Sequence, residues 1–259
     1  MKIATFNVNS IRSRIEPIRT WLSLHQPDVL ALQETKVQDT DFPVDAFADT
    51  GYTVIFRGQK KYNGVALFSR NEPKNVCDRL PGDTGNEARF LQADYGSVTI
   101  INTYIPQGQE MESDKFRYKL QWFGWIRDYL SELIHPKSNV IWLGDLNVAR
   151  EDIDVHNPEG LWGSVCFCKE VQEAFEEVME LGLTDLLRQH HPDQPGLFTF
   201  WDYRVPNGFQ RNLGWRIDYI NATAALAKRC IRCEIDAAPR AVEKSSDHTV
   251  LWAEFDTQP

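Results

Sequence analysis

The chain has 259 residues and a formal net charge of -9 at pH 7, from 28 Lys and Arg against 37 Asp and Glu. This length is sufficient for a large core, and the sequence contains no run of about 18 apolar residues that could span a membrane. The acidic balance argues against a protein that holds nucleic acid by bulk positive charge, although a local basic face remains compatible with it.

The composition shows no boundary between domains. The 13 Pro and 15 Gly residues are scattered and no segment is low in complexity, so we expect a single domain over residues 1–259. The N-terminal segment "MKIATFNVNS" lacks the charged head and apolar stretch of a secretory signal. We therefore expect a cytoplasmic protein.

Predicted strands and helices are mixed along the chain. Runs of β-branched and aromatic residues predict strands at residues 2–6, 28–32, 52–56, 64–69, 89–94, 97–104, 139–143, 216–221 and 249–255. Amphipathic stretches predict helices at residues 13–25, 115–134 and 168–182. The connection "YGS" at residues 95–97 is too short for a crossover helix, which predicts antiparallel pairing. The pattern excludes a simple doubly wound parallel sheet and favours an α/β (α+β) fold with a two-sheet core and helices outside.

Two of the predicted strands end in paired polar side chains. The first strand runs into Asn7 and Asn9, and the stretch "VIWLGDLNVA" at residues 140–149 runs into Asp145 and Asn147. Residues i and i+2 of an extended chain share a face, so each pair can address one point. Turn chemistry explains either stretch alone about equally well, because Gly, Asn and Asp commonly end strands. The repetition favours a common site.

Further polar groups stand at the ends of other predicted strands: Glu34, Tyr104, Asp218, Asp247 and His248. If the carboxylates meet, their repulsion raises their pKa values unless a cation lies among them. Carboxylate and amide oxygens suit Mg²⁺ or Mn²⁺, and a lone His beside acids suggests a proton carrier or a phosphate contact. Taken singly, an acid such as Glu34 or Asp218 is more often a solvated loop residue or part of a capped turn.

The five cysteines allow a zinc alternative. The pairs Cys166 with Cys168 and Cys230 with Cys233 could supply four thiolates. Structural zinc favours wider spacing within a pair, and reduced cysteines are ordinarily small buried apolar groups. We therefore expect no zinc at these cysteines, and metal analysis of the purified protein tests this.

Seven segments together carry a family resemblance: "FNVNSIR", "QPDVLALQETK", "NGVALFSR", "TYIPQG", "GDLNVA", "LGWRID" and "SDHTVLWAEF". In this order they resemble the exonuclease III family of abasic-site endonucleases, within the endonuclease/exonuclease/phosphatase superfamily. The resemblance spans residues 2–255 and implies a four-layered αββα sandwich, with two mixed β-sheets packed face to face and helices on the outside. The active site would lie at one end of the sheets.

The resemblance also implies the activity. The protein would hydrolyse the DNA phosphodiester on the 5′ side of an abasic site with Mg²⁺, for which Mn²⁺ would substitute. Activity as a 3′-to-5′ exonuclease and 3′-phosphatase would accompany it. The partner would be double-stranded DNA with abasic or 3′-blocked lesions, bound by a monomer.

The metal site implied by the resemblance consists of acids and amides at strand ends: Glu34 as principal ligand, Asn7, Asn9, Asp145, Asn147, and Asp247 at a second metal position or a metal-bound water. These groups would neutralise charge on an anionic diester.

The remaining implied roles concern the reacting groups. Asn147 would orient the attacking water and Asp145 would take its proton, with His248 as the alternative base. His248 would contact the scissile phosphate, with its imidazole oriented by Asp218, and Tyr104 would donate to a phosphate oxygen.

Substrate selection is assigned by the resemblance to an aromatic segment. Phe200, Trp215 and Ile217 would line a small pocket for a flipped-out sugar that lacks its base. Read without the resemblance, aromatic residues at strand ends are more often part of the core.

A local basic face would grip the DNA backbone. Its candidate members are Arg57, Lys60, Lys61, Tyr62, Asn63, Arg89, Arg204, Arg211 and Arg216, of which Tyr62 and Asn63 would enter a groove. Each Lys or Arg alone is more often an ordinary solvated charge.

One departure from the family pattern is Ser10, where Gly is common. Two other functions remain open: a superfamily phosphodiesterase or phosphatase acting on RNA, inositol phosphate or phospholipid, and a non-catalytic nucleic-acid-binding regulator. The presence of Glu34, Asp145 and Asp218 argues against the regulator.

Overall fold

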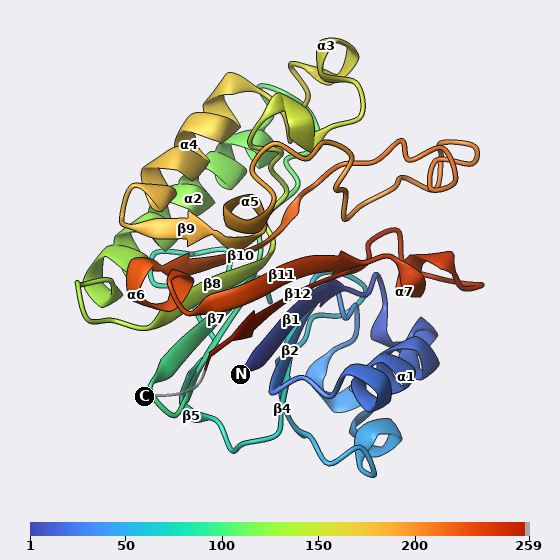
Figure 1. Ribbon diagram of the computed structural model, residues 1–259, viewed down its shortest axis with the longest axis vertical. Helices are drawn as coiled ribbons and strands as arrows, with labels where there is room; N and C mark the ends of the chain where they lie inside the picture. Colours follow the sequence, from blue (N-terminus) through green and yellow to red (C-terminus); the bar gives the residue numbers. More distant parts are fainter. Residues whose placement is uncertain (257–259) are drawn as a thin grey trace.

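The computed structural model describes residues 1–256, which form two six-stranded sheets with helices on their outer faces (Figure 1). The first sheet has the strand order β11-β12-β1-β2-β4-β3. Its strands are β1 (Lys2–Asn7), β2 (Val29–Gln33), β3 (Thr53–Arg57), β4 (Val65–Ser69), β11 (Cys230–Asp236) and β12 (Val250–Phe255). β1 is parallel to β2 and antiparallel to β12, so the sheet is mixed.

The second sheet has the strand order β5-β6-β7-β8-β10-β9. Its strands are β5 (Lys74–Cys77), β6 (Phe90–Tyr95), β7 (Val98–Tyr104), β8 (Val140–Asp145), β9 (Leu183–Asp185) and β10 (Asp218–Thr223). β7 and β8 are parallel, whereas β10 is antiparallel to both of its neighbours. The predicted antiparallel pairing across "YGS" is confirmed, because Tyr95 lies opposite Val98 in the β6–β7 ladder.

Three apolar layers hold the architecture together. Alternate residues of both sheets, such as Ile3, Val29, Ile100 and Ile141, form the central layer between the sheets. The helix α1 (Ile15–His25) covers the outer face of the first sheet. The helices α2 (Asp114–Leu133) and α4 (Lys169–Met179) cover the second sheet. The predicted four-layered sandwich is therefore confirmed.

Nine predicted strands and three predicted helices correspond to observed elements, with ends that differ by a few residues. The prediction missed β5, β9 and β11 and the short helices: η1 (Ile11–Ser13), η2 (Asp39–Asp41), η3 (Val44–Phe47), η4 (Asp152–Asp154), α3 (Pro158–Leu161), α5 (Leu186–His190), α6 (Ala224–Ala227) and α7 (Ala238–Ala241). β11 escaped detection because a bulge between Cys230 and Arg232 breaks its alternation.

A buried polar bridge connects the two sheets. Gln33 on β2 donates through Nε2 to Thr5 Oγ1 at 2.9 Å and to Asn102 Oδ1 at 2.7 Å. Asn102, on β7 of the opposite sheet, donates through Nδ2 to the carbonyls of Leu32 and Ala66, each at 3.0 Å. Directional bonds in an apolar interior fix alignment more strictly than apolar contact does. The bridge therefore fixes the alignment of the two sheets. Because Gln33 directly precedes Glu34, it also fixes the position from which Glu34 extends.

The cysteine pairs lie apart. Cys166 and Cys168 pack in the apolar cluster between the second sheet and its helices, whereas Cys230 and Cys233 belong to the cluster between the sheets. The four thiols therefore do not converge on one point, which removes the basis of the zinc alternative. Within residues 1–256, no helix is both long and apolar enough to cross a membrane.

Candidate active site

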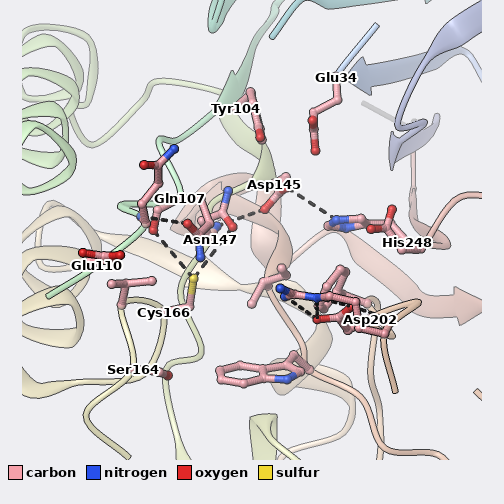
Figure 2. A pocket seen from close by; sticks show the side chains of 17 residues that line it. Glu34, Tyr104, Gln107, Glu110, Asp145, Asn147, Ser164, Cys166, Asp202 and His248 are labelled. Carbon is pink, nitrogen blue, oxygen red and sulfur yellow. Dashed lines mark hydrogen bonds and ion pairs between the residues drawn. The ribbon is translucent and has the colours of Figure 1, made fainter. Parts of the chain in front are cut away.

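The polar strand ends converge at one edge of the sandwich (Figure 2). In the second sheet, Tyr104 pairs with Asp145 and Asp145 pairs with Asp218, so three neighbouring strands place these side chains side by side. The first sheet supplies Glu34 after β2 and His248 before β12. The sequence-predicted site residues Glu34, Tyr104, Asp145, Asn147, Asp247 and His248 all line one cavity of about 540 Å³.

The end of strand β8, which carries Asp145, depends on a glycine. Gly144 has φ +131°, and a Cβ at this position would lie 2.0 Å from the Thr103 carbonyl oxygen of the adjacent strand. Asn147 and Glu34 also have positive φ, at 50° and 52°. Backbone strain of this kind costs roughly 1–3 kcal/mol per residue and occurs preferentially at functional sites. The chain thus holds its polar groups in conformations that side chains rarely adopt.

Ser10 is strained without being part of the cluster, since it has φ 90° and ψ 105°. We expect Ser10→Gly to stabilise the fold by about 1 kcal/mol, because relief of strain exceeds the entropic cost of glycine. Thermal or urea unfolding measures this difference. The control is Ser13→Gly, which removes the same weak hydroxyl contact at 3.4 Å from a residue without positive φ. A Ser10→Gly protein that is less stable than the wild type would contradict the prediction.

Asn7 holds two of the acids together. Its Nδ2 donates to Glu34 Oε1 at 2.9 Å and to Asp145 Oδ2 at 2.8 Å. Asn9 donates in the same way to Asp247 Oδ1 at 2.9 Å. The oxygens of both amides accept other donors, Asn7 Oδ1 from the Asn9 N–H and Asn9 Oδ1 from Lys36. These contacts make Asn7 and Asn9 orienting groups for the acids. Each amide oxygen keeps a second lone pair, so metal ligation by Asn7 and Asn9 stays a prediction.

His248 is clamped between two acids. Its Nδ1 lies 2.8 Å from Asp218 Oδ2, and its Nε2 lies 3.7 Å from Asp145 Oδ2. Burial alone would lower the pKa of His248, but the carboxylates of Asp218 and Asp145 raise it to about 10. The two carboxylates therefore favour the cationic form of the imidazole, whose Nε2 faces the cavity beside Asp145 (Figure 2).

The pKa values of Asp145 and Tyr104 are both raised by burial and by neighbouring charge. Burial raises the pKa of Asp145 to about 7, assisted by the charges of Asp218 and Glu34 and opposed by His248. Burial, together with Glu34 and Asp145, also raises the pKa of Tyr104 well above its usual value. Tyr104 thus remains a hydroxyl donor, whereas Asp145 titrates near neutrality and so has the pKa range expected of a general base.

The donor set fits a hard divalent cation. Oxygen atoms of Glu34 and Asp145 and a ring nitrogen of His248 lie within 4.8 Å of one another. Because the neighbouring carboxylates raise the pKa of His248 and favour its cationic form, we expect the imidazole to contact phosphate and the carboxylate oxygens to hold the metal. Such oxygens suit Mg²⁺ or Mn²⁺ better than zinc. Lys36 Nζ lies 2.8 Å from Glu34 Oε2 and partly neutralises the cluster here.

The predicted aromatic pocket forms the other wall of the cavity. Phe200, Trp215 and Ile217 line it together, and the Phe200 ring centroid lies 4.9 Å from that of His248. Phe200 pairs with both Trp215 and His248 through isolated bridges, which fixes the aromatic wall relative to the reacting groups. The sequence reasoning missed Gln107 and Cys166, which lie beside Asn147.

Several predicted basic groups lie around a second cavity of about 490 Å³, which shares Glu34, Tyr104 and Gln107 with the first. Its lining includes Lys36, Lys61, Tyr62, Asn63, Arg89 and Lys115. Tyr62 is 66% exposed, which leaves it free to contact a ligand. Lys60 and Arg211 are exposed outside this cavity, Arg57 binds the Asp78 carbonyl, and Arg204 pairs with Asp202.

The placement of Arg216 in a DNA-contacting rim is wrong. Its side chain is 0% exposed, and its guanidinium binds Asp154 at 2.7 and 2.8 Å and Asp185 at 2.6 Å. Arg188 adds a second cation to Asp154 at 2.6 Å. Arg216 is therefore saturated by buried carboxylates and lies behind the wall formed by its neighbours Trp215 and Ile217.

The sequence is similar to known proteins over nearly its whole length. Residues 4–248 match the Endonuclease/Exonuclease/phosphatase family. Exodeoxyribonuclease III of Haemophilus influenzae is 36% identical and aligns with 98% of this chain and 100% of its own. The DNA repair nuclease APEX1 of Danio rerio is 32% identical, over 87% of this chain and 74% of its own.

Solved structures are similar over the whole fold. An AP endonuclease from Archaeoglobus fulgidus has a TM-score of 0.96 and 46% identity, covering 99% of this chain and 100% of that one. The 3′ phosphatase NExo from Neisseria, bound to a product DNA hairpin, has a TM-score of 0.96 and 37% identity, covering 99% of both chains. The chain therefore belongs to the Endonuclease/Exonuclease/phosphatase family. The predicted likeness to its exonuclease III and abasic-site endonuclease members is confirmed.

Proposed function

We propose that the protein is a DNA repair nuclease that hydrolyses the phosphodiester on the 5′ side of an abasic site. Exonuclease action from 3′ ends and removal of 3′ phosphates would use the same groups. The observation that carries the proposal is the adjacency, in one cavity, of the Asp145 and His248 pair and the apolar wall of Phe200 and Trp215. Phosphate chemistry and selection of a base-free sugar both require that arrangement.

Each reacting group has a distinct task in this proposal. Asp145 accepts the proton of the attacking water, and Asn147 orients that water. The His248 cation, held by Asp218, and the Tyr104 hydroxyl stabilise the charge that develops on the phosphate oxygens. The water oxygen bonds to phosphorus as the bond from phosphorus to the 3′ oxygen of the preceding nucleotide breaks. That oxygen takes a proton from solvent, so the products are a 3′ hydroxyl on the preceding nucleotide and a 5′ phosphate on the abasic residue.

A divalent cation would be held by Glu34, with Asp247 and Asp145 nearby, and Mg²⁺ or Mn²⁺ suits these oxygens. When bound, it would neutralise phosphate charge and offset the repulsion among the acids. Asn7 and Asn9 keep the carboxylates oriented toward it.

The experiment that tests the function uses a labelled duplex with a single abasic-site analogue, incubated with Mg²⁺ or with EDTA. An intact duplex of the same sequence is the substrate control. Incision on the 5′ side of the lesion that requires Mg²⁺ supports the proposal. If the folded protein leaves the lesion intact, the proposal is contradicted. The alternative function would then be that of another phosphoesterase of the family, acting on RNA or a phosphorylated small molecule.

The aromatic wall should determine selectivity. We expect Phe200→Ala and Trp215→Ala together to lower the preference for abasic over intact DNA by roughly ten-fold or more, since the steric exclusion of a base would be lost. The ratio of kcat/KM for the two duplexes measures this preference. The matched control is Trp162→Ala, which removes an exposed tryptophan outside the cavity. An unchanged ratio in the double variant would contradict the assignment of Phe200 and Trp215 to the pocket that selects a base-free sugar.

The second cavity should make DNA binding depend strongly on salt. We expect the affinity for a non-cleavable duplex to fall by about ten-fold or more between 50 and 200 mM salt, because phosphate contacts release counterions. Lys61→Ala should flatten this dependence relative to Lys137→Ala, an exposed lysine elsewhere. A salt-independent affinity would contradict a basic contact face.

A further inference from the structure

A buried lysine lies directly behind the catalytic cavity. Lys119 belongs to α2, where it occupies the apolar face together with Phe116, Trp122 and Phe123. Its side chain is 0% exposed. Burial lowers the pKa of Lys119, and the charge of Asp145 opposes this without forming an ion pair among the described residues. A buried cation without a direct counterion is costly, so its presence on an otherwise apolar helix face calls for a physical reason.

The ammonium group binds three backbone carbonyls from three different loops. Nζ donates to Asn147 O at 2.6 Å, Val165 O at 2.6 Å and Gln107 O at 3.1 Å. It also lies 3.7 Å from Cys166 Sγ. Three donors on one nitrogen match three acceptors, which satisfies the ammonium group completely.

Each of these loops contributes to the wall of the cavity. Gln107, Asn147, Val165 and Cys166 all line it, and Cys166 Sγ lies 3.8 Å from Asn147 Oδ1 (Figure 2). Asn147 adopts the left-handed backbone region, with φ 50°. A charge-assisted bond to its own carbonyl holds this turn in place.

We propose that Lys119 is a positioning residue, which fixes Asn147 and the adjoining Gln107 and Cys166 wall in the geometry required for phosphodiester hydrolysis. This inference rests on the proposed function for its kinetic consequence. The local ordering that it describes can be measured without any substrate. Lys119 touches no substrate and acts only through the three loops whose carbonyls it binds.

The test replaces Lys119 by Met, which has a similar volume but no donors. We expect kcat for abasic-site incision to fall by about 10- to 100-fold with KM changed less than about three-fold, because the reacting geometry loosens while the binding surface persists. In an Asn147→Ala background the same substitution should cause almost no further loss of kcat. The matched control is Lys137→Met, at an exposed lysine after the same helix, which should behave as wild type.

A second readout follows local opening without DNA. Hydrogen exchange, analysed by peptide mass spectrometry, should become about ten-fold faster in the segment around Asn147 and in that around Cys166 in Lys119→Met, because a buried segment opens locally. The segment around Cys233, which is 0% exposed on the far strand β11, serves as an internal standard and should exchange as slowly as in the wild type.

Several outcomes would overturn the inference. These are a folded Lys119→Met protein with kcat within two-fold of wild type, a loss of kcat that adds fully to that of Asn147→Ala, or unchanged hydrogen exchange around Asn147 and Cys166. If the wild type does not incise, the proposed function fails while the exchange result still decides the ordering role. If Lys119→Met does not fold, Lys119→Arg replaces it, and faster exchange around Asn147 with unchanged kcat would then overturn the inference.

Discussion

Replacing Asp145 by Asn should lower kcat for abasic-site incision by about 10³-fold or more, since a positioned general base contributes up to roughly 10⁴-fold. The amide keeps the size of the side chain and can still accept the backbone N–H of Asn147, which bonds Asp145 Oδ1 at 3.0 Å. The fold should therefore persist, and the loss should appear in kcat under saturating substrate.

The pH dependence separates Asp145 from His248 as the base. If Asp145 is the base, the wild-type rate falls as pH decreases through the carboxyl pKa, which lies near 7 before a cation binds and lower once a cation opposes protonation. The rate also falls above pH about 10, where His248 loses its charge. The Asp145→Asn profile should lack the acidic limb. A variant with near-normal rate and an intact acidic limb would transfer the role to His248.

Replacing Arg216 by Leu should destabilise the fold by about 3–5 kcal/mol, because it leaves the buried carboxylates of Asp154 and Asp185 without their main cation. Thermal and urea unfolding measure this loss. Arg211→Leu, an exposed arginine in the preceding loop, should change stability by less than about 0.5 kcal/mol. Equal stability of the two variants would mean that the buried network contributes nothing.

The same network has a defined pH signature. Burial alone would raise the pKa of Asp154, but Arg216 and Arg188 lower it overall. A carboxyl group with a lowered folded-state pKa stabilises the fold above its unfolded pKa of about 4, and this contribution disappears as pH falls through the folded-state pKa. The stability difference between wild type and Arg216→Leu should therefore shrink in acid. A difference that grows in acid would contradict this assignment.

The sequence was most informative where a pattern is local. The polar ends of β1 and β8 were visible as i and i+2 pairs, and the four layers followed from strand and helix periodicity together with the family resemblance. Glu34, Asp145 and His248 were identified on that basis, and the structure brings them together.

The error at Arg216, and the contacts that the sequence could not show, involve residues far apart in the chain. Arg216 looked like a surface cation beside a motif, because its partners Asp154 and Asp185 lie 62 and 31 residues away. The amide orientations of Asn7 and Asn9 depend on acids from other strands. Lys119 did leave a local signal, since it interrupts the apolar face of a predicted helix between Phe116 and Trp122.

The bridge of Gln33, Thr5 and Asn102 connects two halves of a divided catalytic centre. Glu34 and His248 come with one sheet, and Tyr104, Asp145 and Asp218 come with the other. Neither sheet alone carries all of the catalytic side chains. Catalysis therefore requires both sheets to keep their relative alignment. Turnover therefore reports the alignment of the two sheets. Heat, pressure or a substitution at Gln33 can shift one sheet slightly relative to the other. Such a shift should abolish turnover while the secondary structure is still intact.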